Sequence, residues 1–305
     1  MRVAETNQAT RRAAVTRWYQ HLWHEWVRER QRPILPPAAR PNPASWSNES
    51  LTAAWLGHAT VLINFFGFNI ITDPVLFRRC GIRLPGLTIG PKRLTAPALR
   101  VRELPRIDLV LLSHAHFDHF DTRTLHALSS RADVVTASRT RDILRFTIFR
   151  SKTELRWDEQ IELRRDCGAL RVRAFEVRHW GARLRSDVYR GYNGYVLERE
   201  GHRIIFGGDS AMTGSFAELR SRHRFDLAIM PIGAYDPWIR SHATPEQAVA
   251  MADAAGADHI MPVHHQTFRL SAEPFMEPIE RFEAALRNEP ERIALRGIGE
   301  TYTLP

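Results

Sequence analysis

The stretch Leu109–Arg123, LVLLSHAHFDHFDTR, joins the pattern of a buried strand to a dense group of polar side chains. Its apolar start is typical of a buried strand. Asp121 is placed to cap a helix over 121–129, because an aspartate accepts hydrogen bonds from the first free N–H groups of a helix. Between strand and helix lie four residues of metal-binding type: His114, His116, Asp118 and His119. This arrangement predicts a metal site in a strand-to-helix loop.

The spacing of these four residues favours two metal ions. Side chains two positions apart in an extended segment point the same way, so His114 and His116 can share one ion. Asp118 and His119 lie at the turn into the helix and can face a second ion. Imidazole and carboxylate ligands suit zinc at roughly 2.0–2.2 Å, with iron or manganese as alternatives. The competing interpretation is a capped helix with surface histidines beside it. So dense a group of potential ligands makes that interpretation the less favoured one.

Two ions need more than four ligands, and three later strand patterns end in candidates. His179 lies in VRHWGAR, Asp209 in IIFGGDS, and His264 and His265 in IMPVHHQTF. A carboxylate can bridge two ions, which makes Asp209 the natural bridge, and the two glycines before it allow a close backbone approach. Each residue alone would more often be structural, so the assignment depends on the whole set meeting in the fold.

The composition is that of a soluble globular protein with a basic surface. The chain has 305 residues, of which 44 % are hydrophobic and 25 % charged, and its formal net charge is +9. No stretch approaches the roughly 20 apolar residues of a membrane-spanning helix, and no signal-peptide core is present, which predicts a cytoplasmic location. Two cysteines, Cys80 and Cys167, predict no disulfide framework. Basic charge favours anionic partners and leaves phosphate esters, anionic lipid and nucleic acid open.

The chain is predicted to have two parts. Residues 1–50 contain a basic, tryptophan-containing helix over 10–31, followed by a linker, RPILPPAARPNP, in which proline prevents helix formation. This helix can lie on a membrane surface, although packing against the body of the protein is favoured. Residues 51–305 show strands in two batches, each followed by helices. This pattern favours an α/β fold with two sheets in the middle and helices outside.

His-Ala-His-Phe-Asp-His matches the signature HxHxDH, and together with the later His, Asp and His it makes the chain resemble the metallo-β-lactamase superfamily. The resemblance runs from about Trp55 to Pro278. It is carried by WLGHATVLI, TDPVLF, GPKRL, SHAHFDHFD, RHWGAR, GGDSA, PIGAYDPW and HHQTF. These motifs are similar to the branch that contains N-acyl-phosphatidylethanolamine-hydrolysing phospholipase D and its bacterial relatives. The ascorbate-6-phosphate lactonases are a neighbouring group.

The resemblance implies a four-layer αβ/βα sandwich that binds two divalent metal ions. It implies that one ion is bound by three histidines: His114, His116 and His179. It implies that the other ion is bound by Asp118, His119 and His264, and that Asp209 bridges the two. Asp73, in IITDP, matches a residue that orients a metal-bound histidine, as expected where an imidazole donates its second N–H to a carboxylate.

Further candidates surround this set. His58, in WLGHAT, is near the site by resemblance, with a hydrogen-bonded structural histidine as the alternative. Lys92 and Arg93, in GPKRL, can bind a phosphate or form a solvated turn. His265, beside His264, is a further candidate for the surroundings of the ions or for substrate contact.

Asp118 and His242 are the catalytic candidates, and His242 can serve as a proton donor or a substrate contact. Two metal ions lower the pKa of a bound water and supply hydroxide at neutral pH. We therefore expect a binuclear hydrolase, most simply a phosphodiesterase of phospholipase D type on an anionic phosphoester or N-acyl phospholipid. The alternative is a lactonase or other carbonyl hydrolase on a small phosphorylated metabolite. Thr244 is predicted to cap a helix that starts at Pro245.

The expected partner is a lipid or small-molecule phosphoester, with peripheral contact at the inner membrane surface through residues 10–31. Nucleic acid is not expected, because Asp209 and His264 are only 55 positions apart, which leaves no room for the extra domain of the superfamily's nucleases. A non-catalytic metal-dependent scaffold is disfavoured, because every expected ligand type is present.

Overall fold

The computed structural model describes residue 29 and residues 31–84, 86–129, 132–184, 186–221 and 223–304. The chain divides into two compact units, Met1–Ile34 and Leu35–Pro305. The helix predicted over 10–31 lies almost wholly outside the described residues. Residues 35–50 belong to the second unit, where the backbone N–H groups of Leu35 and Ala39 donate to the carbonyls of Leu94 and Ile298. Among the described helices, none has the length and apolar content needed to cross a bilayer.

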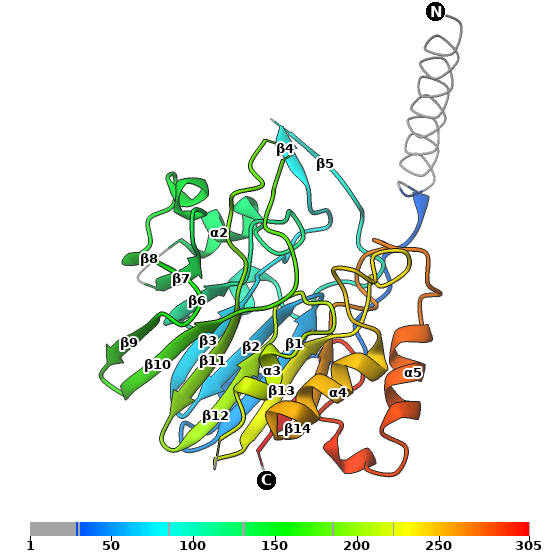
Figure 1. The fold of residues 1–305 in the computed structure, drawn as a ribbon. Coiled ribbons are helices and arrows are strands. Elements are labelled where there is room, and N and C mark those ends of the chain that lie inside the picture. Colours follow the sequence, from blue (N-terminus) through cyan, green and yellow to red (C-terminus); the bar gives the residue numbers. More distant parts are fainter. Residues whose placement is uncertain are drawn as a thin grey trace, which may run out of the picture. The chain divides into compact units, whose positions relative to one another are not determined.

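The first sheet of the second unit has seven strands in the order β15-β1-β2-β3-β6-β7-β8 (Figure 1). They are β1 (Leu51–Gly57), β2 (Thr60–Phe65), β3 (Phe68–Thr72), β6 (Leu109–Leu112), β7 (Asp133–Ala137), β8 (Ser151–Leu155) and β15 (Thr301–Thr303). In this order, the pairs β15–β1, β1–β2 and β2–β3 are antiparallel, whereas β3–β6, β6–β7 and β7–β8 are parallel. The strand predicted before the metal-binding motif is therefore β6, in the interior of this sheet.

The second sheet has six strands in the order β14-β13-β12-β11-β10-β9. They are β9 (Gln160–Arg165), β10 (Gly168–Phe175), β11 (Gly194–Arg199), β12 (His202–Phe206), β13 (Phe225–Pro231) and β14 (Ala257–Val263). The predicted hairpin turn at Glu200-Gly201 joins β11 to β12, and both residues have positive φ, as a tight two-residue hairpin loop requires. Two short strands, β4 (Ile82–Leu84) and β5 (Leu87–Ile89), form a separate hairpin.

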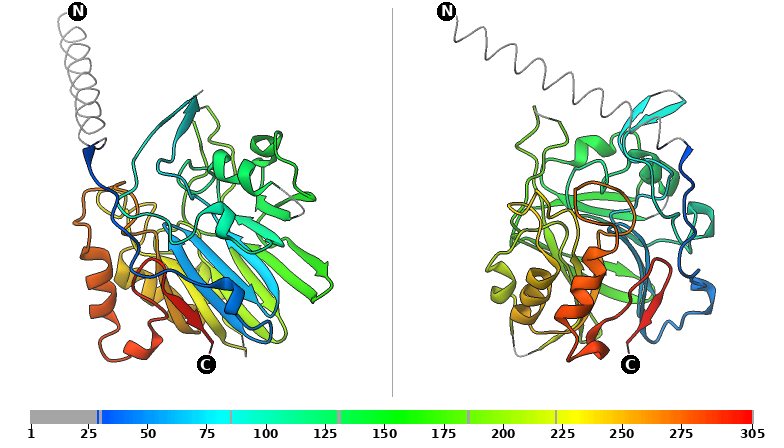
Figure 2. Two further views of the ribbon diagram at one scale, coloured as in Figure 1. Left: turned by 180° about the vertical axis from the view of Figure 1, so that it is seen from behind. Right: turned by 90° about the vertical axis from the view of Figure 1, so that its right-hand side faces the viewer.

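The two large sheets enclose the main core. One hydrophobic cluster joins Trp55 and Leu111 of the first sheet to Tyr195 and Phe206 of the second, all fully buried. A second cluster lies between the second sheet and three helices, α3 (Ser215–Glu218), α4 (Pro245–Ala255) and α5 (Glu277–Ala285), of which α4 and α5 face the viewer in the right-hand view of Figure 2. The helix α2 (Thr122–Leu128) adds Leu125 and Leu128 to the main core. The predicted α/β sandwich is confirmed.

Four single-turn 3-10 helices complete the described elements. They are η1 (Pro43–Ser45), η2 (Val101–Glu103), η3 (Arg141–Leu144) and η4 (Pro290–Arg292).

Both predicted helix caps are present. The Asp121 carboxylate accepts hydrogen bonds from the backbone N–H groups of Arg123 and Thr124 at the start of α2. Thr244 and Gln247 cap α4 reciprocally, each side chain accepting from the other's backbone N–H. The first cap fixes the end of the loop that carries the histidine cluster, and the second follows closely on His242.

Candidate metal centre

Four side chains converge after strands β6, β10 and β12. His114, His116, His179 and Asp209 each offer a ligand atom, and these atoms all lie within 4.8 Å of one another. His116 Nδ1 is 2.7 Å from His114 Nε2 and 3.3 Å from His179 Nε2. Asp209 Oδ2 is 3.9 Å from the Nε2 atoms of His114 and His179. The fold therefore brings together residues that are up to 95 positions apart.

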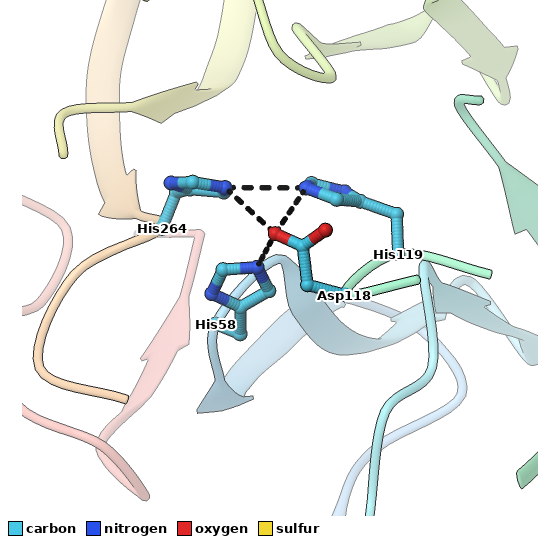
Figure 3. Close-up of side chains that lie close together, drawn as sticks. All are labelled: His58, Asp118, His119 and His264. Carbon is cyan, nitrogen blue, oxygen red and sulfur yellow. Dashed lines mark hydrogen bonds and ion pairs between the residues drawn. The ribbon is translucent and has the colours of Figure 1, made fainter. Parts of the chain in front are cut away.

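A second cluster lies beside the first and shares the same carboxylate oxygen. Asp209 Oδ2 is 3.1 Å from His119 Nε2 and 3.2 Å from His264 Nε2. Asp118 Oδ2 is 3.6 Å and 3.7 Å from the same two nitrogens, which are themselves 3.2 Å apart. Figure 3 shows Asp118, His119 and His264 pointing toward one another, with His58 below them. All seven predicted ligands thus meet in one place, with Asp209 next to both clusters.

The spacing of these atoms fits metal ions. Ligands at about 2.0–2.2 Å around a tetrahedral ion lie roughly 3.3–3.6 Å from one another. The contacts among Asp118, His119, His264 and Asp209 Oδ2, at 3.1 to 3.7 Å, fall close to that range. His116 Nε2 and Asp209 Oδ1 are buried without a hydrogen-bond partner among the described residues. A buried polar atom without a partner is costly, so the cluster is suited to hold cations.

The three histidines of the first cluster have the charge of a ligand set, whereas in the second cluster the carboxylates of Asp209 and Asp118 outweigh burial, raise the pKa of His119 and bring that of His264 to about 9. Burial lowers the pKa of His114 and of His179 well below the ordinary value, and that of His116 to about 4. These imidazoles are therefore neutral and free to donate lone pairs at pH 7. Burial opposes ionisation of Asp118 and Asp209, but the neighbouring histidines outweigh it and hold the pKa of both carboxyls well below the usual range.

Asp73 orients His119 from behind. It is fully buried, accepts a hydrogen bond from His119 Nδ1 at 2.7 Å, and accepts another from the backbone N–H of Ser113 at 2.7 Å. The first bond leaves His119 Nε2 facing the cluster, which is the arrangement expected behind a metal-bound imidazole. His179 is oriented in the same way, since its Nδ1 donates to the Ser241 carbonyl at 2.9 Å.

His58 contacts the second cluster directly. Its Nε2 donates to Asp118 Oδ2 at 3.0 Å, and its ring lies 4.1 Å, between centroids, from that of His264. Burial lowers the pKa of His58 to about 3, so the ring is neutral. Its backbone has φ of +57°, and its N–H donates to Thr267 Oγ1 at 2.6 Å. His58 thus has a left-handed conformation and donates a hydrogen bond to a residue three positions beyond His264.

His242 lines the pocket above the clusters, with one ring nitrogen, Nδ1, 3.9 Å from Asp209 Oδ2. Three other predicted residues lie away from the pocket lining. The fully buried Arg93 guanidinium donates to the carbonyls of Phe77, Thr95 and Val75, and Lys92 beside it is also buried. His265 is buried with its ring stacked on Trp55, 4.5 Å between centroids.

The clusters form the floor of a pocket of about 330 Å³. Its walls are largely apolar and include Phe117, Trp180, Trp238 and Leu270. Arg183 also lines it. The Arg183 Nη1 donates to the carbonyls of Ala115 and Phe120, at 2.9 Å each, and the guanidinium lies 3.9 Å from the Phe117 ring centroid. Burial lowers the pKa of Arg183 to about 10, so it stays charged at pH 7.

Sequence reasoning did not single out Arg183, Trp180 or Trp238. Arg183 and Trp180 lie within RHWGAR, beside His179, and that proximity was the available signal. Nothing in the local sequence distinguishes Trp238 from a tryptophan of the core.

Comparisons with known proteins agree with this geometry. An uncharacterized protein of Mycobacterium tuberculosis is 35 % identical over 274 residues, which cover 87 % of this chain and 71 % of that protein. N-acyl-phosphatidylethanolamine-hydrolyzing phospholipase D 1 of Caenorhabditis elegans is 28 % identical, covering 78 % of this chain and 70 % of that protein. A UPF0173 metal-dependent hydrolase of Cupriavidus taiwanensis is 27 % identical, covering 82 % and 86 %.

A solved structure and a family match extend the comparison. The metallo hydrolase Igni18 of Ignicoccus hospitalis superposes with a TM-score of 0.61 at 17 % identity, covering 84 % of this chain and 99 % of that chain, which supports the fold. Residues 69–265 match the beta-lactamase superfamily domain. That range holds all seven converging side chains and more than half of the sequence, and the chain therefore belongs to the beta-lactamase superfamily, among its metal-dependent hydrolases.

Proposed function

We propose that this chain is a binuclear metal-dependent phosphodiesterase of phospholipase D type, acting on an anionic phosphoester or an N-acyl phospholipid. The observation that carries the proposal is the pair of ligand clusters that share Asp209 Oδ2 on the floor of one pocket. Two zinc ions are the proposed cofactors, with manganese or iron as alternatives. The name of the Caenorhabditis elegans relative supports the substrate class.

The ligand clusters define what each residue contributes. Two divalent ions held there would supply the positive charge that activates a water molecule and stabilises charge developing at phosphorus. Asp118 is 18 % exposed while its Oδ2 accepts from His58, so the carboxylate is fixed in orientation yet open to the pocket. We assign Asp118 to ligation and to accepting the proton of the attacking water.

His242 and Arg183 act on the substrate in this proposal. Burial lowers the pKa of His242 below the ordinary value, so the ring is neutral at pH 7 and can donate a hydrogen bond from its one N–H to the leaving oxygen. The Arg183 guanidinium uses one nitrogen for the Ala115 and Phe120 carbonyls, which leaves other N–H groups for a phosphate oxygen. We therefore assign the phosphate contact to Arg183 and not to Lys92 and Arg93, because these two lie outside the pocket lining.

The apolar walls fit the remainder of a lipid substrate. Trp180 and Trp238 are both more than half exposed although they line the pocket. Exposed aromatic side chains beside a polar floor are suited to an amphipathic ligand, whose apolar part they contact while its anionic group reaches the floor.

The test is turnover of bis-p-nitrophenyl phosphate and of N-acyl-phosphatidylethanolamine by purified protein, before and after chelation. We expect chelation to abolish turnover of both, and zinc or manganese to restore it. His116→Ala is expected to lose bound metal and activity together, whereas His126→Ala, at an exposed position of α2, serves as the matched control.

Turnover of a lactone panel, with no turnover of either phosphodiester, would replace this proposal with the carbonyl-hydrolase alternative. Unchanged metal stoichiometry in His116→Ala would contradict the ligand assignment itself.

A further inference from the structure

The β4–β5 hairpin presents an apolar face that is about half exposed in the part of the chain that the structure describes. Ile82 pairs with Ile89 and Leu84 with Leu87, and cross-strand partners point to the same side of a sheet. Residues two apart also share a side, so all four apolar side chains lie on one face, with Arg83 and Thr88 on the other. The four are 41 to 48 % exposed.

The hairpin stands apart from the core. Among the described residues it forms a two-stranded sheet of its own, and none of its apolar residues belongs to a described hydrophobic cluster. A ribbon of two three-residue strands is too short to be stable alone. The hairpin therefore depends on the residues that join it to the rest of the fold, Cys80 and Gly81 before β4 and Gly90 and Pro91 after β5, which we call its stem. The stem is narrow, because a Cβ at Gly81 would lie 2.1 Å from the Ile89 carbonyl oxygen and one at Gly90 2.0 Å from the Cys80 carbonyl oxygen.

The stem is part of the pocket wall. Cys80 precedes β4 and Pro91 follows β5, and both residues line the pocket above the two ligand clusters. Trp180 and Trp238 line the same pocket and are exposed, as is Ile239 next to Trp238. The hairpin therefore extends from residues of the pocket wall, and the pocket itself carries further exposed apolar side chains.

The segment that carries the hairpin is basic. Between Asp73 and Glu103 there is no acidic residue, and seven basic residues lie there: Arg78, Arg79, Arg83, Lys92, Arg93, Arg100 and Arg102. Of these, Arg78 and Arg83 are exposed at the hairpin and its stem. Apolar side chains next to exposed arginines are the pattern of a surface that lies in the interface of an anionic bilayer.

We propose that the apolar face of the β4–β5 hairpin inserts into the interface of a membrane that contains anionic lipid and so holds the pocket mouth against the lipid surface. This inference adds a membrane contact to the proposed function. It rests on the proposed function only for the identity of the substrate, a phospholipid. A second copy of the chain fits this face less well. Four half-exposed side chains fall far short of the roughly 800 Å² that each partner buries in a stable pair, and a two-fold contact would bring the two basic segments together.

The experiment is co-sedimentation of the metal-loaded full chain with vesicles of phosphatidylethanolamine and phosphatidylglycerol, compared with vesicles in which phosphatidylcholine replaces phosphatidylglycerol. The test variant is Leu84→Ser with Leu87→Ser. The matched control is Phe146→Ser with Ile148→Ser, which removes side chains that are 73 % and 82 % exposed outside the pocket. We expect the test variant to lose at least tenfold in affinity for the anionic vesicles and the control to bind like the parent chain.

Two further readouts separate this inference from its alternatives. Turnover of bis-p-nitrophenyl phosphate should be equal in all three proteins, which shows that the variants are folded and loaded. The inference is overturned if the parent chain binds neither vesicle or if the test variant keeps its affinity. A lower molecular mass of the test variant by light scattering would overturn it in favour of a second copy. Vesicle binding without any phosphodiester turnover would instead refute the proposed function.

Discussion

Asp73 acts on the second cluster through the hydrogen bond that it accepts from His119 Nδ1. The substitution Asp73→Asn tests the contribution of that bond. An asparagine oxygen can still accept from Ser113, but His119 Nδ1 loses its charged acceptor. Outer partners of metal-bound histidines are typically worth 10–100-fold in metal affinity. We expect zinc affinity at one of the two proposed sites to fall by about that factor, as measured by calorimetric titration. Asp166→Asn, at an exposed turn, is the matched control. Equal weakening of both sites would contradict a role confined to His119.

Arg183 is the one cationic side chain among the described residues that line the pocket, and its substitution tests the proposed phosphate contact. A hydrogen bond to a charged group is worth about 1.5–3 kcal/mol, or roughly a 10–100-fold change in binding. We expect Arg183→Met to raise KM for bis-p-nitrophenyl phosphate by about that factor, with a smaller effect on kcat, and Arg183→Lys to recover part of the loss. A role limited to the Ala115 and Phe120 carbonyls would instead lower metal content or Tm and leave KM unchanged.

At the scale of elements, Asp133 links the edges of the two sheets. At the start of β7 it accepts from Arg150, just before β8, from Ser151 at the start of β8, and from Arg165 of β9 in the other sheet. Burial raises the pKa of Asp133, but these hydrogen bonds outweigh it and bring the value to about 2. Because the folded pKa is depressed, the linked stability is present above the unfolded value near 3.9 and is lost as pH falls toward 2.

Asp133→Asn is therefore expected to cost about 2 kcal/mol in the free energy of unfolding at pH 7. Urea unfolding from pH 7 to pH 3 measures it. The difference from the parent chain should stay constant down to about pH 5 and shrink below about pH 4. Asp166→Asn again provides the control, and a pH-independent difference would show that packing, not charge, explains the loss.

Turns and helix caps that depend on residues close together in the sequence could be predicted. Contacts between residues far apart in the sequence could not. The β11–β12 turn and the Asp121 and Thr244 caps depend on residues within four positions of each other, and all three were predicted. Arg93 is buried by carbonyls that only the folded chain brings together, so GPKRL resembled a surface phosphate site. The β4–β5 hairpin was not separated from its surroundings, because its three-residue strands give little periodicity.

The same distinction holds for the site. The ligand types after β6, β10, β12 and β14 are visible in the sequence, since carboxyl ends of strands in a layered α/β fold collect at one edge. The contact between His58 and Asp118 is not visible there. It depends on the β1–β2 turn meeting the β6–α2 loop across 60 positions of sequence.

At the scale of the molecule, the two ligand clusters join the two halves of the sandwich. The loop of residues 114–119 follows β6 of the first sheet, whereas His179, Asp209 and His264 follow strands of the second. Ions bound by both sets would therefore tie the sheets together at one end. Anything that binds the folded chain more tightly than the unfolded one stabilises it, by about 4 kcal/mol at a thousandfold excess over Kd.

Metal removal should for this reason lower the stability of the whole fold, and not only the activity. Two sites of that strength correspond to a fall in Tm on the order of 10 °C or more for a domain of this size. Differential scanning calorimetry of loaded and chelated protein measures it. His264→Ala, which removes a ligand from the second sheet, should start from a lower Tm and respond less to chelator, whereas His126→Ala should behave like the parent chain. A chelator effect on activity with no change in Tm would mean that the ions do not bridge the two sheets.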